Sequence, residues 1–411
     1  MEFSIKNFNQ ITTKINLNVG QVTLVSGVNG IGKSIIAKLL YCLLKSNCEL
    51  RYEPAINTIN YHIEDFFKIL NSVEKIDVNP LTHIDDEYQI IGEYLTFKDK
   101  IIQENNIIYK KYEEKIKLIN SLIKILQDNS TQLHLSLLRT LLIKMFSKNI
   151  TGEIKIQEKN KKEEYYKINL TDHDLYDDKI LEYINGPIFP QVYYIDNSGT
   201  ILDYLDYNGT FNNENIKYIN EKIHDNEKGL FDETNNTELI KLEEELINII
   251  GGTFEYNQYN RLIFKKLSGE VLNLNHVSSG VRNIGLLYLL LNNRQIPKGT
   301  FIIIDEIENN LHSEVKLKLA EWLCKFCKYW DVNLYINSKS PMFIEAMEVY
   351  SVKYELDDFI EYNLLKYNKA GEVSCNNLKR HNLFLLYDDL GNAYDIIDEQ
   401  RVKNIFELKK N

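Results

Sequence analysis

The residues from Gly27 to Ser34 have the types and spacing needed to bind a phosphate chain. They read Gly-Val-Asn-Gly-Ile-Gly-Lys-Ser, which is G-x-x-x-x-G-K-[ST], between an apolar run at 22–25 and a segment with periodic apolar residues. Glycines let backbone N–H groups turn toward a phosphate, and a helix N-terminus adds partial positive charge. The lysine can reach the β- and γ-phosphates, and the serine hydroxyl can ligate Mg²⁺. We therefore predict nucleotide binding through Gly27, Asn29, Gly30, Gly32, Lys33 and Ser34.

Two acids follow the apolar run Phe301 to Ile304, and they supply the second half of the predicted site. Such a run is typical of a buried parallel strand, and ligands bind beyond the carboxyl ends of such strands. Asp305 is placed to share Mg²⁺ with Ser34, and Glu306 to activate a water. The other interpretation is a strand that merely ends in acids. The phosphate-binding loop upstream favours the functional interpretation.

The segment Val277 to Arg282 opens an apolar helix that extends through Leu291. Serine and glycine at a helix start are ordinary capping residues. The same geometry offers backbone N–H groups and a hydroxyl to an anion. Both interpretations remain open on these residues alone.

This segment resembles the signature loop of ABC-type ATPases, whose common form is Leu-Ser-Gly-Gly-Gln. Val277, Ser278 and Gly280 match it in kind, whereas Ser279 replaces a glycine and Val281 replaces the glutamine. The resemblance implies an α/β P-loop NTPase fold, with an ABC-type head built on a mixed sheet flanked by helices. It also implies that two heads sandwich two ATP molecules head to tail. Each nucleotide would then meet Ser278, Ser279 and Gly280 of the partner copy.

Further motifs are similar to the OLD-type branch, which also resembles RecF and the SMC heads. They are Ile5 to Phe8, the phosphate-binding loop, and Asp305 to His312, where Ile307 stands in place of the usual proline. The resemblance covers the first 46 residues and roughly 251–366. In this branch a Thr-His-Ser-Pro motif follows the next strand, and its histidine senses the γ-phosphate.

The corresponding segment here is Ser338-Lys339-Ser340-Pro341, so Lys339 aligns with the histidine. A lysine holds a phosphate as a point charge, but a charged lysine cannot accept a hydrogen bond from the attacking water. Our hypothesis is slow hydrolysis, with ATP acting mainly as a clamp between subunits. Gln191 is either the Mg²⁺-contacting glutamine of the ABC lid or a plain strand-start residue.

We predict three domain segments from the patterns along the chain. The ATPase head comprises 1–50, 186–200 and 251–411, with strands at 2–8, 11–17, 21–26 and 191–196. A mostly helical insertion at 51–185 contains a helix at 97–126 and a β-hairpin around 154–168. A second helical insertion covers 201–250. Short strands are expected near 253–257, 261–266, 271–274, 351–355 and 360–367.

The composition is that of a globular protein, with 411 residues, 44% hydrophobic and 26% charged. A net charge of −11 argues against a surface that is basic all over. The first eight residues do not resemble a signal peptide, and no apolar run approaches 18 residues, so we expect a cytoplasmic protein. Cys324 and Cys327 have no second pair with which to bind zinc, and we expect buried thiols.

About 70 residues follow Pro341, which is short for the TOPRIM nuclease domain that OLD-type proteins often carry. We therefore expect a stand-alone ATPase that controls a separate nuclease or toxin effector, similar to the ATPases of the Septu and PARIS antiphage systems. One alternative is a hydrolysis-dead scaffold that uses ATP only to assemble. Another is a RecF-like DNA clamp, whose candidate grip alternates with glutamates and also fits a solvated face. The grip would be Arg139, Lys144, Lys148, Lys155, Lys161 and Lys162.

Overall fold

The computed structural model describes residues 1–49 except 9–10, then 150–157, 166–170, 189–196, 214–224, and 237–386 except 260 and 384. Between 50 and 149 it describes helical pieces at 62–63, 66–70, 94, 98, 110–120, 123, 138 and 141–146, and it also describes residue 400. The chain divides into two compact units, one of Met1–Lys45 with Arg139–Asn411 and one of Ser46–Leu138. In the second unit, the ring of Phe66 meets those of Tyr94 and Tyr112 edge-on.

A six-stranded mixed sheet forms the centre of the first unit, in the order β13-β12-β3-β11-β10-β6. All neighbouring strands are parallel except β12 and β13. The apolar runs of β3 and β10 explain their central places, because a parallel strand covered on both faces needs apolar residues throughout. The bounds are β3 Val22–Gly27, β6 Val192–Asp196, β10 Phe301–Asp305, β11 Asn333–Asn337, β12 Ile360–Tyr367 and β13 Val373–Leu378.

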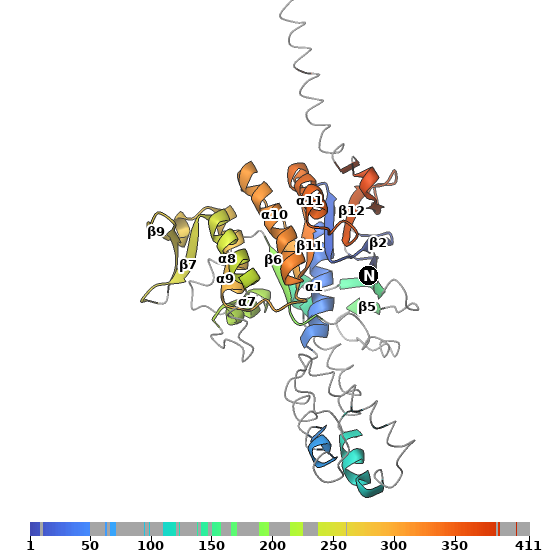
Figure 1. The fold of residues 1–411 in the computed structure, drawn as a ribbon. Helices are drawn as coiled ribbons and strands as arrows, with labels where there is room; N and C mark the ends of the chain where they lie inside the picture. The colour runs from blue at the N-terminus through green and yellow to red at the C-terminus, as the bar shows by residue number, and fades with distance from the viewer. Residues whose placement is uncertain are drawn as a thin grey trace, which may run out of the picture. The chain divides into compact units, whose positions relative to one another are not determined.

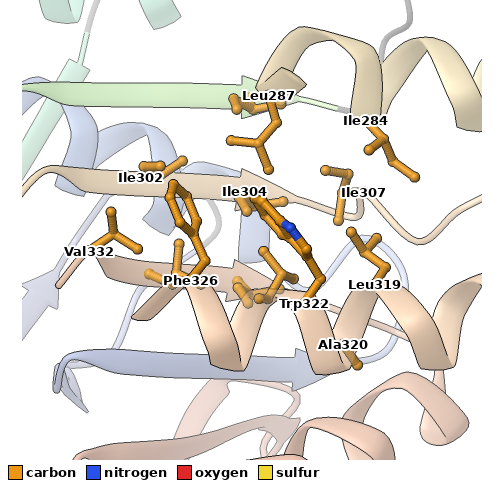
Figure 2. Close-up of a cluster of buried hydrophobic side chains, with 14 of the residues drawn as sticks. Ile284, Leu287, Ile302, Ile304, Ile307, Leu319, Ala320, Trp322, Phe326 and Val332 are labelled. Atoms are coloured by element: carbon orange, nitrogen blue, oxygen red, sulfur yellow. The ribbon is translucent and has the colours of Figure 1, made fainter. Parts of the chain in front are cut away.

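Helices cover both faces of this sheet (Figure 1). On one face α1, Lys33–Glu49, lies against β6, where the ring centroids of Tyr41 and Tyr194 are 5.8 Å apart. On the other, α10 (Ser313–Trp330) and α11 (Pro341–Lys353) pack against the sheet and each other. Figure 2 shows Trp322 and Phe326 of α10 pointing toward Ile302 and Ile304 of β10 in this core.

A third layer follows, made of α8 (Thr237–Ile250), α9 (Ser279–Asn292) and a small antiparallel sheet. The indole N–H of Trp322 donates to the carbonyl of Leu242 at 2.7 Å, which joins α8 to α10. The segment 201–250 is therefore not a separate insertion throughout, because the apolar face of α8 is buried in the main core. The layer also contains α7 Glu214–His224, β7 Gly252–Tyr256, β8 Leu262–Lys266, β9 Val271–Asn273 and the short 3₁₀ helix Leu274–His276.

A second antiparallel sheet has the order β2-β1-β4-β5. Strands β1 (Glu2–Lys6) and β2 (Ile15–Asn18) come from the N-terminus, and β4 (Ile150–Gln157) with β5 (Tyr166–Leu170) forms the predicted hairpin. We expected this hairpin within the 51–185 insertion. Instead residues 153–157 of β4 pair with all of β1, so the hairpin belongs to the first unit because backbone hydrogen bonds join it there.

The structure also bears on several smaller predictions. The strand expected at 351–355 is wrong, because α11 continues to Lys353 with a turn after it. Cys324 and Cys327 are buried free thiols, as expected. The helix predicted at 97–126 lies largely outside the described residues. Of the candidate DNA grip, Lys144 is exposed and Lys155 lies in β4, whereas the other four residues lie outside the described residues: Arg139, Lys148, Lys161 and Lys162. Among the described helices, none combines the length and apolarity that crossing a membrane requires.

Replacing Trp322 tests the core that supports the sheet. The residue is 1% exposed, its ring centroid lies 4.7 Å from that of Phe326, and its indole N–H supplies the hydrogen bond to Leu242. Trp322→Ala should lower the free energy of unfolding by about 3–5 kcal/mol, measured by denaturant titration. Leu317→Ala, which removes a 38% exposed side chain from the same helix, should change it by less than about 0.5 kcal/mol. Equal losses in the two variants would contradict this account of the core.

Candidate nucleotide-binding site

The loop between β3 and α1 needs glycine at particular positions. A Cβ on Gly27 would lie 2.6 Å from the carbonyl oxygen of Leu365 on the neighbouring strand, so only glycine fits there. Gly32, with φ of +108°, has a backbone conformation that side chains rarely permit. The helix begins at the next residue, Lys33, so the loop ends at a helix N-terminus. Asn29, Gly30 and Ser34 are exposed on this loop, as a ligand-binding surface requires.

Lys33 folds back over the loop that precedes it. Its Nζ donates to the carbonyl oxygens of Gly27 at 2.7 Å and Val28 at 3.2 Å, and only 5% of the residue is exposed. Burial lowers the pKa of Lys33, and the charges of Glu306 and Asp305 partly oppose that shift. The ammonium group is therefore held inside the loop by the carbonyl groups that bend around it.

Asp305 ends β10 in a buried position and is oriented by two neutral donors. The side-chain amide of Asn337 donates to its Oδ1 at 2.9 Å, and the hydroxyl of Tyr194 donates to its Oδ2 at 3.0 Å. Neither donor was predicted, although Tyr194 lies on the strand expected at 191–196. Asp196, the last residue of β6, is in register with Asp305 and was also missed. The sequence signal that could have identified Asp196 is that its strand, like β10, ends in an acid.

Glu306 leaves the strand in a left-handed conformation, with φ of +58°, and its carboxylate meets two lysines. Lys339 Nζ lies 2.9 Å from Oε2 and Lys33 Nζ lies 3.9 Å from Oε1. The amide of Asn309 also donates to Oε2 at 2.7 Å. Burial raises the pKa of Glu306, but the hydrogen bonds from Lys339 and Asn309 and the two lysine charges outweigh it, so the pKa lies below its ordinary value.

The residues predicted from two distant parts of the chain therefore converge. The phosphate-binding loop follows β3, Asp305 and Glu306 end β10, and Lys339 follows β11; these strands are parallel neighbours, so their carboxyl ends share one edge. A carboxylate at this edge retains lone pairs beyond the two that its donors use, so the donor set suits a hydrated Mg²⁺ near Ser34. The oxygen atoms of Asp305 and Ser34 suit a magnesium ion, and the glycine loop suits the phosphates of a nucleotide.

The turn at Ser278 to Gly280 packs on the loop that follows β10. Ser278 caps α9, its hydroxyl accepting from the N–H of Val281 at 3.4 Å, as the capping interpretation predicted. Ser279 Oγ accepts from the amide of Asn310 at 3.1 Å. A Cβ on Gly280 would lie 2.9 Å from the carbonyl oxygen of Asn310. Glycine is thus required by packing within one chain, and Ser278 remains exposed.

Gln191 lies at the opposite end of the sheet from this site. It precedes β6, and its carbonyl accepts from the N–H of Phe301 at the start of β10 at 2.9 Å. Phe301 and Asp305 are four residue steps apart along β10, about 13 Å at the rise of an extended chain. Its side chain accepts a hydrogen bond from Tyr218. The interpretation of Gln191 as a Mg²⁺ contact is therefore wrong, because parallel strands place it at the amino edge.

Comparison with known proteins identifies the family. No curated protein sequence matches the chain. The SMC head domain of Thermotoga maritima aligns at 12% identity and a TM-score of 0.37, covering 92% of this chain and 98% of that one. A Pyrococcus furiosus Smc head with an extended coiled coil, bound to the C-terminal domain of ScpA, aligns at 13% identity and a TM-score of 0.38. The alignment covers 97% of this chain and 98% of that one.

The decisive match is to a family model described as the AAA ATPase domain, which covers residues 1–329. That range contains the glycine loop, Asp305 and Glu306. The chain belongs to the AAA ATPase domain family and has the fold of a P-loop ATPase.

Proposed function

We propose that this protein is a slow, ABC-type ATPase that dimerises around ATP and controls a separate effector protein. The observation that carries the ATPase proposal is the meeting of Lys33, Glu306 and Lys339 at one sheet edge. Two cations and a carboxylate there match the needs of phosphoryl transfer, in which positioning and charge stabilisation supply most of the catalysis.

In the proposed reaction, the oxygen of a water attacks the γ-phosphorus, and the bond between that phosphorus and the β–γ bridging oxygen breaks. Glu306 takes a proton from the water, and the products are ADP and inorganic phosphate. Lys33 and the backbone N–H groups of the loop hold the β- and γ-phosphates. Lys339 stabilises charge on the transferred group, and a phosphate would draw it away from Glu306.

Ser34 and Asp305 would hold Mg²⁺, with Asp305 oriented by Tyr194 and Asn337. When bound, the ion neutralises charge on the β- and γ-phosphate oxygens. The two donors to Asp305 fix its carboxylate plane, which is the role that groups around a metal ligand commonly have.

Slow hydrolysis is supported by the identity of the residue that pairs with Glu306, which is a lysine at position 339. Lys339, unlike a neutral histidine, cannot accept a hydrogen bond from the attacking water. Bound ATP would then persist long enough to act as a clamp.

The proposed dimer places Ser278, Ser279 and Gly280 of one copy over the nucleotide of the other. Support comes from the exposed Ser278 hydroxyl and the helix N-terminus that it caps, since both can meet an anion. The branch assignment, OLD-like with a role in antiphage defence, rests on the motifs quoted from the sequence. In that proposal the unit Ser46–Leu138 is an insertion that the effector, a nuclease or a toxin, can contact.

Glu306→Gln should trap an ATP-bound dimer, because the amide cannot accept the proton from water while the phosphate contacts stay. Light scattering after gel filtration with ATP and Mg²⁺ should show a dimer for Glu306→Gln and a monomer for Lys33→Ala, which lacks the phosphate-binding charge. Glu345→Gln, an exposed acid on α11, should behave like wild type. A Glu306→Gln protein that stays monomeric at saturating ATP would refute the clamp.

Lys339→Ala should lower kcat by about tenfold, the loss expected when a charge contact worth about 1.4 kcal/mol in the transition state disappears. Phosphate release at saturating ATP measures it. Lys369→Ala removes an exposed lysine from the turn between β12 and β13 and should leave the rate unchanged. Rapid hydrolysis that persists unchanged in Lys339→Ala would exclude any role for this lysine.

Purification of the protein from its native operon with ATP present should recover a stoichiometric nuclease or toxin. The Lys33→Ala variant, which lacks the nucleotide clamp, should recover it in altered amount. If wild type instead binds random duplex DNA in a salt-sensitive manner and recovers no such protein, the effector proposal fails in favour of a DNA clamp.

A further inference from the structure

Glu308 is a buried acid to which the proposed mechanism gives no task. It is 0% exposed, and its Oε1 accepts the hydroxyl of Ser338 at 2.5 Å. Its Oε2 is buried and has no hydrogen-bond partner among the residues that the structure describes. Burial raises the pKa of Glu308, and the hydrogen bond from Ser338 acts in the opposite direction. Because burying a polar group without full hydrogen bonding is costly, this position calls for a specific role.

The Ser338 hydroxyl, which donates to Glu308, also makes a hydrogen bond within the loop that carries Lys339. Ser338 Oγ also accepts the backbone N–H of Ser340 at 3.1 Å. The backbone N–H of Ser338 donates to the carbonyl of Val25 in β3 at 3.0 Å. One hydroxyl thus links the residues on either side of Lys339, and its orientation is set by the Glu308 carboxylate, which accepts its hydrogen bond.

The carboxylate itself belongs to the loop that carries Glu306. Within that loop, the N–H of Asn309 donates to the carbonyl of Glu306 at 3.1 Å, and the N–H of Leu311 donates to the carbonyl of Glu308 at 3.4 Å. The bond between Glu308 and Ser338 therefore joins two loops whose outer side chains, Glu306 and Lys339, form the ion pair at 2.9 Å.

We propose that Glu308 is a positioning residue that acts through Ser338 to hold Lys339 against Glu306. The proposal rests on the proposed ATPase function for its catalytic consequence, but the placement of Lys339 can be measured without nucleotide. A role confined to stability would lower the melting temperature and leave the environment of Lys339 in the folded protein unchanged.

The test compares Glu308→Ala, Glu308→Gln and Ser338→Ala by competitive chemical labelling of lysines, without nucleotide, quantified by mass spectrometry. Lys339 reactivity is expressed relative to exposed Lys369. We expect it to rise several-fold in Glu308→Ala and in Ser338→Ala, because a displaced loop no longer holds the ammonium group on its carboxylate. Glu308→Gln should stay within about twofold of wild type, since an amide oxygen still accepts the hydroxyl.

Kinetics supply the second measurement. Glu308→Ala should lower kcat for ATP hydrolysis by about tenfold, a change of about 1.4 kcal/mol, with KM unchanged, and Glu308→Gln should restore it. The double variant with Ser338→Ala should lose no more than either single variant, because the two side chains act as one unit. Glu345→Ala, an exposed acid on α11, is the matched control and should change neither measurement.

Unchanged Lys339 labelling in folded Glu308→Ala would overturn the proposal, as would a Glu308→Gln protein as impaired as Glu308→Ala. If Glu308→Ala does not fold, Ser338→Ala removes the same hydrogen bond and decides the outcome alone. Absence of ATP binding and phosphate release by wild type would refute the proposed function. Labelling would still decide the role of Glu308, so the two failures are distinguishable.

Discussion

Glu306 is shared by two lysines, and the candidate site is organised around that pairing. Lys33 and Lys339 carry the charges that a triphosphate needs, and in this structure both face the same carboxylate. A buried cation without a counter-charge would be costly, so Glu306 stabilises the site before any phosphate arrives. In the proposed reaction an arriving phosphate competes with Glu306 for the two lysines, so nucleotide binding would be coupled to activation of the base.

This coupling contains a physical compromise. In this structure the contacts that hold Lys339 and Lys33 lower the pKa of Glu306, and both lysines must turn to the phosphate before the carboxylate can act as the proposed base. In the slow ATPase that we propose, Lys339 cannot accept a hydrogen bond from the attacking water, which favours retention of the nucleotide. Such retention would suit the proposed control of an effector, because the lifetime of the bound state would set the duration of the signal.

The rest of the fold keeps these charges in place. Parallel neighbours β3, β11 and β10 bring the glycine loop, Lys339 and Glu306 to one edge, and apolar layers cover the sheet on both faces. Trp322 joins α10 to α8 through one buried hydrogen bond. The loop after β10 also reaches the Ser278 to Gly280 turn through Asn310. One short loop therefore carries Glu306 and also contacts the turn that, in the proposed dimer, meets the partner's nucleotide.

The local features of the site could be read from the sequence. The glycine loop between β3 and α1, the apolar run that ends at Asp305, and the serine cap of α9 are each set by neighbouring residues, whose spacing is visible without any fold. The family motifs added Lys339, whose neighbours in the chain reveal nothing about Glu306.

Only the tertiary structure decided what depends on pairing between distant strands. It placed Gln191 at the amino edge, joined the hairpin of β4 and β5 to β1, and buried α8 in the main core. It also supplied Asn337 and Tyr194 to Asp305 and brought Ser338 to Glu308. Strand order arises from backbone hydrogen bonds between segments that are far apart in the sequence, and the residues of one strand do not reveal which strand will pair with it. The amino-acid sequence therefore determined which chemical groups are available for the site, and the parallel sheet determined which of them meet.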